Sequence, residues 1–290
     1  MHTISQGMQM SEKSFLSLSA VGFHRIAYTE WGPPDAARTV VCVHGLTRNG
    51  RDFDFLAWAL AAEGWRVVCP DVVGRGRSDR LPVPDLYGFP QYLADMTALI
   101  ARLDVAELDW VGTSMGGAIG LLLAAQPKTP IRRLVLNDVG PLIPKASLER
   151  IAGYVGADRD FDDIDGVERY LREIFAGFGL LTDAQWLHLA IHSAVTQPDG
   201  RWRLAYDPAI GTSMTTKPIE DVNLWPLWQR VTGPVLILRG ESSDVLLPDT
   251  AKAMIEHSPH AKLVEFSGVG HAPALMAEDQ IATVRDFLTA

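Results

Sequence analysis

Short apolar runs alternate along this chain with longer stretches of helical periodicity, and this alternation constrains the fold more than any other feature. The runs are continuous rather than alternating in polarity, which is typical of strands that are buried on both faces. A parallel sheet with helices on both sides has this pattern. The six runs are residues 39–43, 65–69, 108–111, 131–136, 235–238 and 263–266, and two earlier segments, 15–18 and 23–31, indicate an antiparallel start to the sheet.

Helical periodicity marks the segments between several of these runs. Apolar residues recur at intervals of three and four over residues 93–103 and again over 281–288, which predicts helices with one apolar stripe against the sheet. Residues 115–126 are apolar nearly all round and stop before Pro127, which predicts a buried helix.

Strand signals stop from Pro141 to about Val222, and this segment carries many aromatic residues. It is too long for a loop inside a compact domain. We expect a helical insertion, residues 141–222, that forms a cap over a core made of residues 1–140 and 223–290. The aromatic residues of this predicted cap are expected to pack its interior and to line a substrate pocket.

Charge and cysteine content limit the classes of partner. With 26 basic and 35 acidic residues the formal net charge is 26 minus 35, or -9, which disfavours sequence-independent binding to nucleic acid or anionic membranes. Cys42 and Cys69 are too few for a disulfide framework and lie in apolar runs, so we expect two buried free thiols. The polar first fourteen residues contain no secretory signal and no apolar run reaches the roughly 18 residues of a membrane span, so a cytoplasmic protein is expected.

The most specific motif is G-x-S-x-G, formed by Gly112, Ser114 and Gly116. It stands between a predicted strand and the predicted helix 115–126, which is the context that a nucleophile turn requires. Glycines are needed there because side chains would collide with the adjoining turn. At a helix N-terminus the serine also lies close to unpaired backbone N–H groups. Ser114 is therefore the candidate nucleophile.

A serine nucleophile needs a base, usually a histidine oriented by a carboxylate. His271 lies in a glycine-rich loop after the last strand run, and it is the candidate base. For the other histidines a surface or packing role is expected. The acid should follow an earlier strand, and we favour Asp244. The alternatives for the acid are Glu241, Asp249 and Asp138.

Acyl transfer also requires hydrogen-bond donors for the oxyanion of the tetrahedral intermediate. One candidate is the backbone N–H of Met115, directly after the nucleophile. The other is the N–H of Leu46, in the tight turn that follows the strand run 39–43. His44 begins that turn and is expected to fix it through side-chain hydrogen bonds rather than to take part in catalysis.

Taken together, these residues resemble the α/β-hydrolase family over almost the whole chain, from about residue 23 to 288. The resemblance implies an eight-stranded, mostly parallel sheet with a lid inserted after strand six. It also implies Ser114 as nucleophile, His271 as base, Asp244 as acid and Leu46 and Met115 as backbone donors. One departure is that Asp244 stands four residues after Gly240, where three is the commoner spacing. The motifs that carry the resemblance are His44-Gly45, the segment 70–79, Gly112 to Gly116 and Gly270-His271.

The segments 44–50 and 137–141 look more narrowly like bacterial carboxylesterases, some of which accept short acyl esters and aliphatic polyesters. We therefore expect a serine carboxylesterase that acts on a small ester without a cofactor or metal. A carbon–carbon bond hydrolase, a lactonase, a thioesterase and a hydrolase-fold small-molecule receptor remain as alternatives. The sequence does not indicate the oligomeric state.

Overall fold

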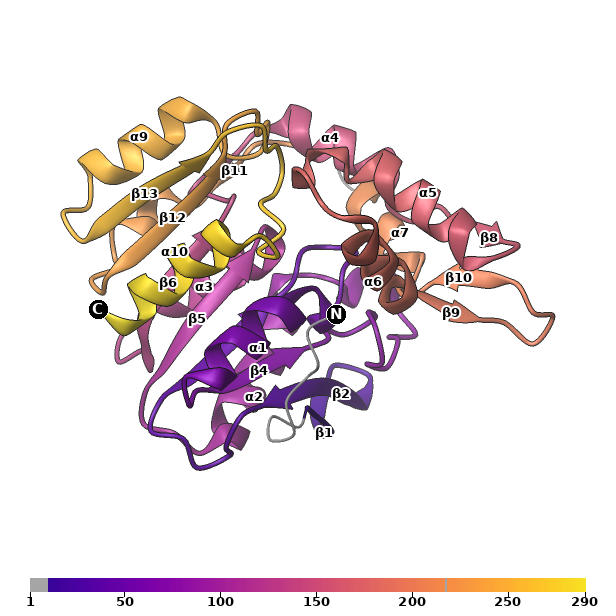
Figure 1. Cartoon of the computed structure of the whole chain (residues 1–290), viewed down its shortest axis with the longest axis horizontal. Helices are drawn as coiled ribbons and strands as arrows, with labels where there is room; N and C mark the ends of the chain where they lie inside the picture. Colours follow the sequence, from indigo (N-terminus) through magenta and orange to yellow (C-terminus); the bar gives the residue numbers. More distant parts are fainter. Residues whose placement is uncertain (1–9, 217) are drawn as a thin grey trace.

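A computed structural model describes residues 10–216 and 218–290. Its centre is an eight-stranded sheet with the strand order β1-β2-β4-β3-β5-β6-β12-β13 (Figure 1). The pairs β1–β2 and β2–β4 are antiparallel and the other pairs are parallel. The strands are β1 (Ser11–Ser19), β2 (Gly22–Trp31), β3 (Thr39–Val43), β4 (Arg66–Pro70), β5 (Leu108–Thr113), β6 (Ile131–Asn137), β12 (Val235–Gly240) and β13 (Ala261–Phe266). The predicted α/β-hydrolase sheet is confirmed.

The central strands are continuous apolar runs because both of their faces are covered. In β3 every residue is buried, and successive side chains enter different cores: Val41 joins one hydrophobic cluster and Cys42 the other. Helices α1 (Asp54–Ala62) and α10 (Glu278–Thr289) pack together on one face, toward the viewer in Figure 1. Helices α2 (Phe89–Leu103) and α3 (Met115–Ala124) cover the other face, and α9 (Pro248–Glu256) lies beside β13.

Several local predictions are confirmed at this level. Helix α2 buries Met96 and Leu103 of the stripe that its periodicity predicts, and α3 is buried along most of its length. Cys42 and Cys69 are buried free thiols. None of the described residues belongs to a helix long and apolar enough to cross a bilayer. Of the polar N-terminal segment, residues 1–9 lie outside the described residues.

Residues 141–222 lie between the sixth and seventh strands of the sheet along the chain. Short strands at the two ends of this insertion, β7 (Leu142–Ile143) and β11 (Val222–Asn223), pair with each other, so the insertion leaves and rejoins the core at one place. Between them lie α4 (Lys145–Ala152), β8 (Asp160–Phe161), α5 (Ile164–Ile174), the 3-10 turn Ala176–Phe178, α6 (Asp183–Ser193), β9 (Ala194–Thr196), β10 (Trp202–Leu204) and α7 (Ala209–Thr215).

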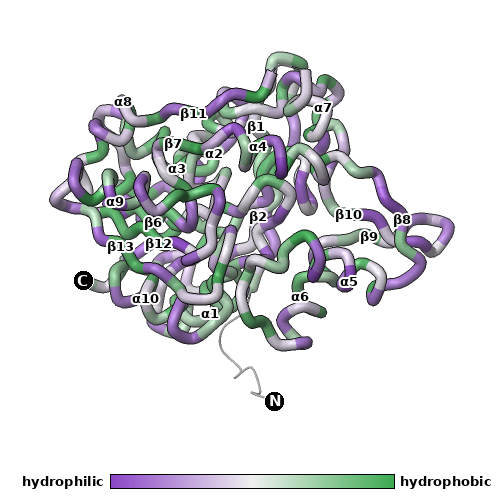
Figure 2. Tube along the Cα trace, turned by 90° about the horizontal axis from the view of Figure 1, so that it is seen from above, coloured by the Kyte–Doolittle hydropathy of each residue, from purple (hydrophilic) through white to green (hydrophobic). Residues whose placement is uncertain are grey.

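The expectation that strands are missing from the insertion is wrong. Strands β8, β10 and β9 form a small antiparallel sheet at the end of the insertion that projects from the core, where hydrophilic residues gather (Figure 2). Each of these strands has only two or three residues, which is too short for a recognisable polarity pattern. The short helix α8 (Trp225–Trp228) then leads back to β12.

Candidate active site

Ser114 stands at the turn between β5 and α3 with φ 52° and ψ -115°, a strained backbone for a residue with a side chain. Two close approaches explain the glycines of the motif. A Cβ at Gly112 would lie 2.3 Å from the carbonyl oxygen of Gly116, and a Cβ at Gly116 would lie 2.0 Å from that of Val43. The turn can therefore form only with glycine at both positions, and it presents the serine hydroxyl at the carboxyl edge of the sheet.

His271 lies in the loop between β13 and α10, and its Nε2 is 2.9 Å from Ser114 Oγ. The loop is held against the serine turn by Asn137, whose amide nitrogen donates to the Pro273 carbonyl at 2.8 Å and to Thr113 Oγ1 at 2.9 Å. The last residue of β6 thus ties together the two loops that carry the serine and the histidine.

The other ring nitrogen of His271, Nδ1, is 2.7 Å from Oδ2 of Asp138, which directly follows β6. Asp138 is fully buried. Its Oδ1 accepts the backbone N–H of Gly240 at 2.9 Å, and its Oδ2 accepts the hydroxyl of Ser243 at 2.5 Å. Donors of this kind stabilise the ionised form of a buried carboxyl group. Ser114, His271 and Asp138 form one continuous hydrogen-bonded chain.

The prediction that Asp244 lies against His271 is wrong. Asp244 forms a two-pronged ion pair with Arg150 of α4, at 2.6 Å and 2.9 Å, and 47% of its side chain is exposed. The physical reason is the extra residue after Gly240. The position three residues after Gly240 holds Ser243, which donates to Asp138, and the next residue faces the insertion instead.

Asp138 is one of the alternatives that the sequence left open, and the unusual spacing after Gly240 is a signal that could have pointed to it. Because β6 and β12 are parallel neighbours, their carboxyl ends meet at one edge, and either strand can bring a carboxylate to His271. The other two alternatives have local roles. Glu241 accepts hydrogen bonds from Ser267 and Gly268, and Asp249 lies in the first turn of α9.

The two predicted oxyanion donors flank Ser114. Met115 is the first residue of α3, so its N–H has no partner within the helix. Leu46 follows Gly45, at which a Cβ would lie 3.8 Å from the Cβ of Ser114. Within residues 10–216 and 218–290, neither N–H donates to another group of the chain.

His44 holds the peptide that carries the Leu46 N–H. Its Nδ1 donates to the carbonyl of Gly45 at 2.7 Å, and its Nε2 accepts the N–H of Val72 at 2.9 Å. Burial lowers the pKa of His44 to about 3, so the ring is neutral and can donate at one nitrogen and accept at the other. In a trans peptide the C=O and N–H point in opposite directions, so fixing the Gly45 carbonyl also directs the Leu46 N–H.

A cavity of about 40 Å³ opens beside Ser114 and His271. The core and the insertion both line it, and most of the insertion's lining residues are apolar or aromatic. Phe175 and Phe178 stack on each other with ring centres 4.7 Å apart. Three aromatic residues of the insertion, Tyr154, Phe175 and Phe178, line this cavity. The insertion contributes Arg150, Ile151, Tyr154, Ile174, Phe175 and Phe178.

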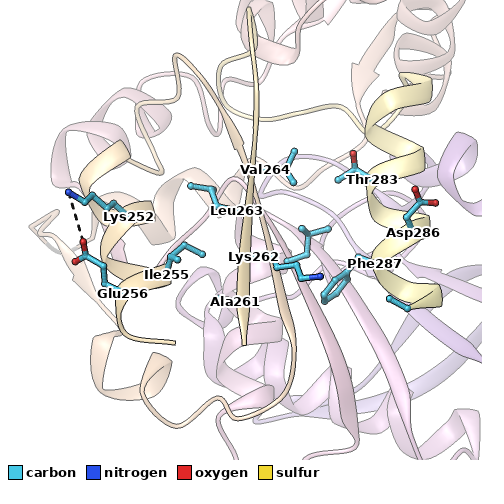
Figure 3. Close-up of a pocket in the computed structure, with 12 residues that line it drawn as sticks. Lys252, Ile255, Glu256, Ala261, Lys262, Leu263, Val264, Thr283, Asp286 and Phe287 are labelled. Atoms are coloured by element: carbon cyan, nitrogen blue, oxygen red, sulfur yellow. Dashed lines mark ion pairs between the residues drawn. The ribbon is translucent and has the colours of Figure 1, made fainter. Parts of the chain in front are cut away.

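A larger cavity, about 840 Å³, lies at the outer edge of the sheet (Figure 3). There β13 is an edge strand between α9 and α10, and Leu263 and Val264 point to opposite sides of it. The residues that line this cavity include no serine, cysteine or histidine. It therefore lacks a serine or cysteine nucleophile paired with a histidine base, and the size of a cavity alone would not identify the candidate active site of this molecule.

One cluster of possible metal ligands occurs among the described residues. Asp54 of α1 and His188 and His192 of α6 place ligand atoms within 4.8 Å of one another. Burial lowers the pKa of His192 to about 3. However, both oxygens of Asp54 already accept hydrogen bonds from Arg51, at 2.5–2.9 Å. A cation there would compete with a guanidinium for the carboxylate.

The chain is similar to known hydrolases over nearly its full length. Residues 38–276 match the family model described as the alpha/beta hydrolase fold. A 3-hydroxybutyrate-oligomer hydrolase from Cupriavidus necator is 46% identical over 280 residues, which cover 94% of this chain and 95% of that protein.

Two solved structures resemble the whole chain. A putative hydrolase from Rickettsia typhi has a TM-score of 0.89 at 31% identity and covers 97% of this chain and 99% of its own. An alpha/beta hydrolase from Novosphingobium aromaticivorans has a TM-score of 0.86 at 36% identity, with 97% and 98% covered.

Proposed function

The chain belongs to the α/β-hydrolase family, and on that premise we propose that it is a serine carboxylesterase that cleaves oligomers of 3-hydroxybutyrate. The hydrogen-bonded chain from Ser114 through His271 to Asp138 is the observation that carries this proposal. The substrate class comes from the similarity to the 3-hydroxybutyrate-oligomer hydrolase and from the expectation that aliphatic polyesters are accepted.

In the proposed reaction, Ser114 Oγ attacks the ester carbonyl carbon while its proton passes to Nε2 of His271. The tetrahedral intermediate collapses when the bond to the leaving alkoxide breaks and the imidazolium returns the proton to that oxygen. A water molecule then attacks the acyl-enzyme in the same way, which releases the acid and restores the serine. For an oligomer, the alcohol released is the hydroxyl end of the next 3-hydroxybutyrate unit.

Asp138 has two tasks in this scheme. It accepts a hydrogen bond from Nδ1–H, which leaves Nε2 free to act as the base, and its negative charge stabilises the imidazolium that forms during the attack. Its burial and its further donors, Gly240 and Ser243, hold the carboxylate in one orientation. These contacts support Asp138, rather than Asp244, as the acid.

The N–H groups of Leu46 and Met115 are the proposed donors to the oxyanion. A donor that is in place before the reaction needs no reorganisation when charge develops, and one well-placed donor is worth about 10² to 10³ in rate. The hydrogen bond from His44 to the Gly45 carbonyl supports this role, because it fixes the peptide group that carries the Leu46 N–H.

The insertion is proposed to act as a cap that must move during turnover. The cavity of about 40 Å³ beside Ser114 is much smaller than the roughly 300–1,000 Å³ of typical small-molecule pockets. An ester with two hydroxybutyrate units cannot enter it unless the aromatic wall, Phe175 and Phe178, moves outward. Lid movements of this kind commonly control access in enzymes.

Hydrolysis of the linear trimer of 3-hydroxybutyrate, followed by chromatography of the products, tests the proposal. Ser114→Ala is expected to lower kcat at least about 10³-fold while leaving the unfolding transition unchanged. Ser19→Ala, in the β1–β2 hairpin, is the matched control and should keep full activity. Undiminished hydrolysis by Ser114→Ala would refute the serine mechanism. An active wild-type enzyme that cleaves p-nitrophenyl butyrate but leaves the trimer intact would refute the substrate class.

A further inference from the structure

Arg75 is among the largest fully buried side chains of the molecule, with 1% of its surface exposed. It belongs to the segment 70–79 that carries part of the family resemblance, yet the proposed reaction gives it no task. A guanidinium stays protonated in proteins, so this is a permanent positive charge inside the core. Its surroundings therefore need an explanation.

The guanidinium contacts both residues that supply the proposed oxyanion donors. Its Nε donates to the carbonyl oxygen of Leu46 at 2.8 Å, and its Nη2 lies 3.6 Å from the sulfur of Met115. Nη1 donates to the carbonyl of Val73 at 2.7 Å and to the hydroxyl of Tyr92 at 3.1 Å. The guanidinium of Arg75 thus links the turn that carries Leu46 to the start of α3 at Met115.

All four of these partners are uncharged, and the positive charge is otherwise faced by aromatic rings. The guanidinium carbon lies 5.0 Å from the ring centre of Tyr92 and 5.8 Å from that of Tyr87. Rings of this kind stabilise a cation only in part, and a buried charge without a counter-ion is costly. The charge also contributes to the lowered pKa of His44, after the larger effect of burial, so its field reaches the oxyanion turn.

The backbone around Arg75 is fixed, so the side chain is presented from a rigid turn. Gly74 has φ 80°, and a Cβ there would lie 2.5 Å from the ring of Tyr87. Gly76 has φ 53°, and a Cβ there would lie 2.4 Å from the carboxylate of Asp71. The Gly76 N–H donates to the Ala205 carbonyl of the insertion at 2.7 Å. Side chains larger than glycine would strain both positions.

We propose that Arg75 is a positioning residue of the oxyanion site. It holds the Leu46 carbonyl and the Met115 side chain at the distances that aim the two backbone N–H groups at one point. Its charge, which pairs with no carboxylate of residues 10–216 and 218–290, favours the negative oxygen of the tetrahedral intermediate over the neutral ester carbonyl. The inference rests on the proposed function, since it assumes that the Ser114 adduct forms between Leu46 and Met115.

Arg75→Met tests the inference, because methionine keeps much of the side-chain volume and removes the charge and the donors. With p-nitrophenyl butyrate we expect kcat to fall about ten- to hundredfold, less than the roughly 10² to 10³ lost with an oxyanion donor itself. KM should change by less than about threefold, because the neutral ester gains little from the charge. Butylboronic acid, which forms a negatively charged tetrahedral adduct on serine, should bind more weakly by the same factor as kcat falls.

Arg66→Met is the control for loss of a partly buried arginine away from the site. Arg66 is the first residue of β4 and lies at the opposite edge of the sheet from Ser114. It pairs with Glu30 and donates to the carbonyl of Leu103. The Arg66→Met variant should be less stable than wild type and should keep the wild-type kcat and boronate affinity. A folded Arg75→Met enzyme with kcat and boronate affinity within about twofold of wild type would overturn the inference.

Arg75→Lys gives a second measurement if the methionine variant does not fold. An ammonium keeps the charge but cannot reach Leu46, Val73 and Met115 together, so we expect kcat to fall about three- to tenfold and to lie above that of Arg75→Met. Wild-type kcat in Arg75→Lys would overturn the positioning role. These outcomes are separable from failure of the proposed function, which would appear as retained activity in Ser114→Ala.

Discussion

Two aspartates follow neighbouring strands of the sheet, and they lie in opposite surroundings. Asp138, after β6, is fully buried and contacts Ser243 and His271. Asp244, after β12, is about half exposed and pairs with Arg150 on the surface. Parallel strands that end at one edge therefore offer two places for an acid. The donors that surround each carboxylate decide which of the two meets the histidine.

Asp138→Asn changes the buried aspartate of this pair, and it has the largest expected effect on kcat. An asparagine amide can donate to Nδ1, which would move the imidazole proton to Nε2 and remove the base from Ser114. A loss of about 10⁴ in kcat is expected, as for removal of the acid in serine hydrolases generally. Steady-state hydrolysis of p-nitrophenyl butyrate measures it.

Asp244→Asn is the matched variant on the exposed side and should keep kcat within about threefold, because exposed ion pairs are worth little. If the two variants ranked in the reverse order, with Asp244→Asn inactive and Asp138→Asn active, the assignment of the acid would be wrong.

Exchanging Asp138 and Ser243 tests whether a carboxylate can also reach His271 from β12. Ser243 stands at the commoner acid spacing after Gly240 and already touches Asp138. The double variant Asp138→Ser and Ser243→Asp keeps one carboxylate and one hydroxyl in the same space. We expect kcat about ten- to hundredfold above that of Asp138→Ser alone, a partial return of the roughly 10⁴ lost. Equal kcat in both variants would mean that β12 cannot supply the acid.

Removing only the Ser243 hydroxyl is expected to have a smaller effect than changing the acid. Ser243→Ala leaves Asp138 with the Gly240 and His271 contacts, and the loss of one hydrogen bond to a charged group should lower the free energy of unfolding by about 1.5–3 kcal/mol. Urea unfolding measures this change. Val245 and Leu246 also donate to Ser243 Oγ, so part of the loss reflects the turn after β12. An unchanged midpoint would show that Ser243 does not support the acid.

The smallest effect is expected from the surface pair. Arg150→Met removes the partner of Asp244, and since both side chains are nearly half exposed, the free energy of unfolding should change by about 0.2–1 kcal/mol. The difference from wild type should shrink at high salt, where exposed charges are screened. A loss of several kcal/mol in urea unfolding would mean that the pair holds the insertion to the core.

The sheet could be predicted because burial on both faces leaves a continuous apolar run, as in residues 39–43 and 235–238. The serine turn could be predicted because Gly112 and Gly116 have no alternative at their close contacts. In the insertion, the strands could not be predicted, since two or three residues such as Trp202–Leu204 carry no periodicity.

The acid was missed for a different reason. Which carboxylate meets His271 depends on the pairing of β6 with β12, which brings together residues about a hundred positions apart. The sequence marks Arg75 only as part of the segment 70–79, because its contacts with Leu46 and Met115 also join distant parts of the chain.

Proton NMR of the His271 Nδ1–H tests the central contact most directly. A proton shared between imidazole and a buried carboxylate resonates far downfield of other N–H groups. The contact with Asp138 predicts such a signal in wild type and in Asp244→Asn, and its loss in Asp138→Asn. A downfield signal that persists in Asp138→Asn and disappears in Asp244→Asn would contradict the account.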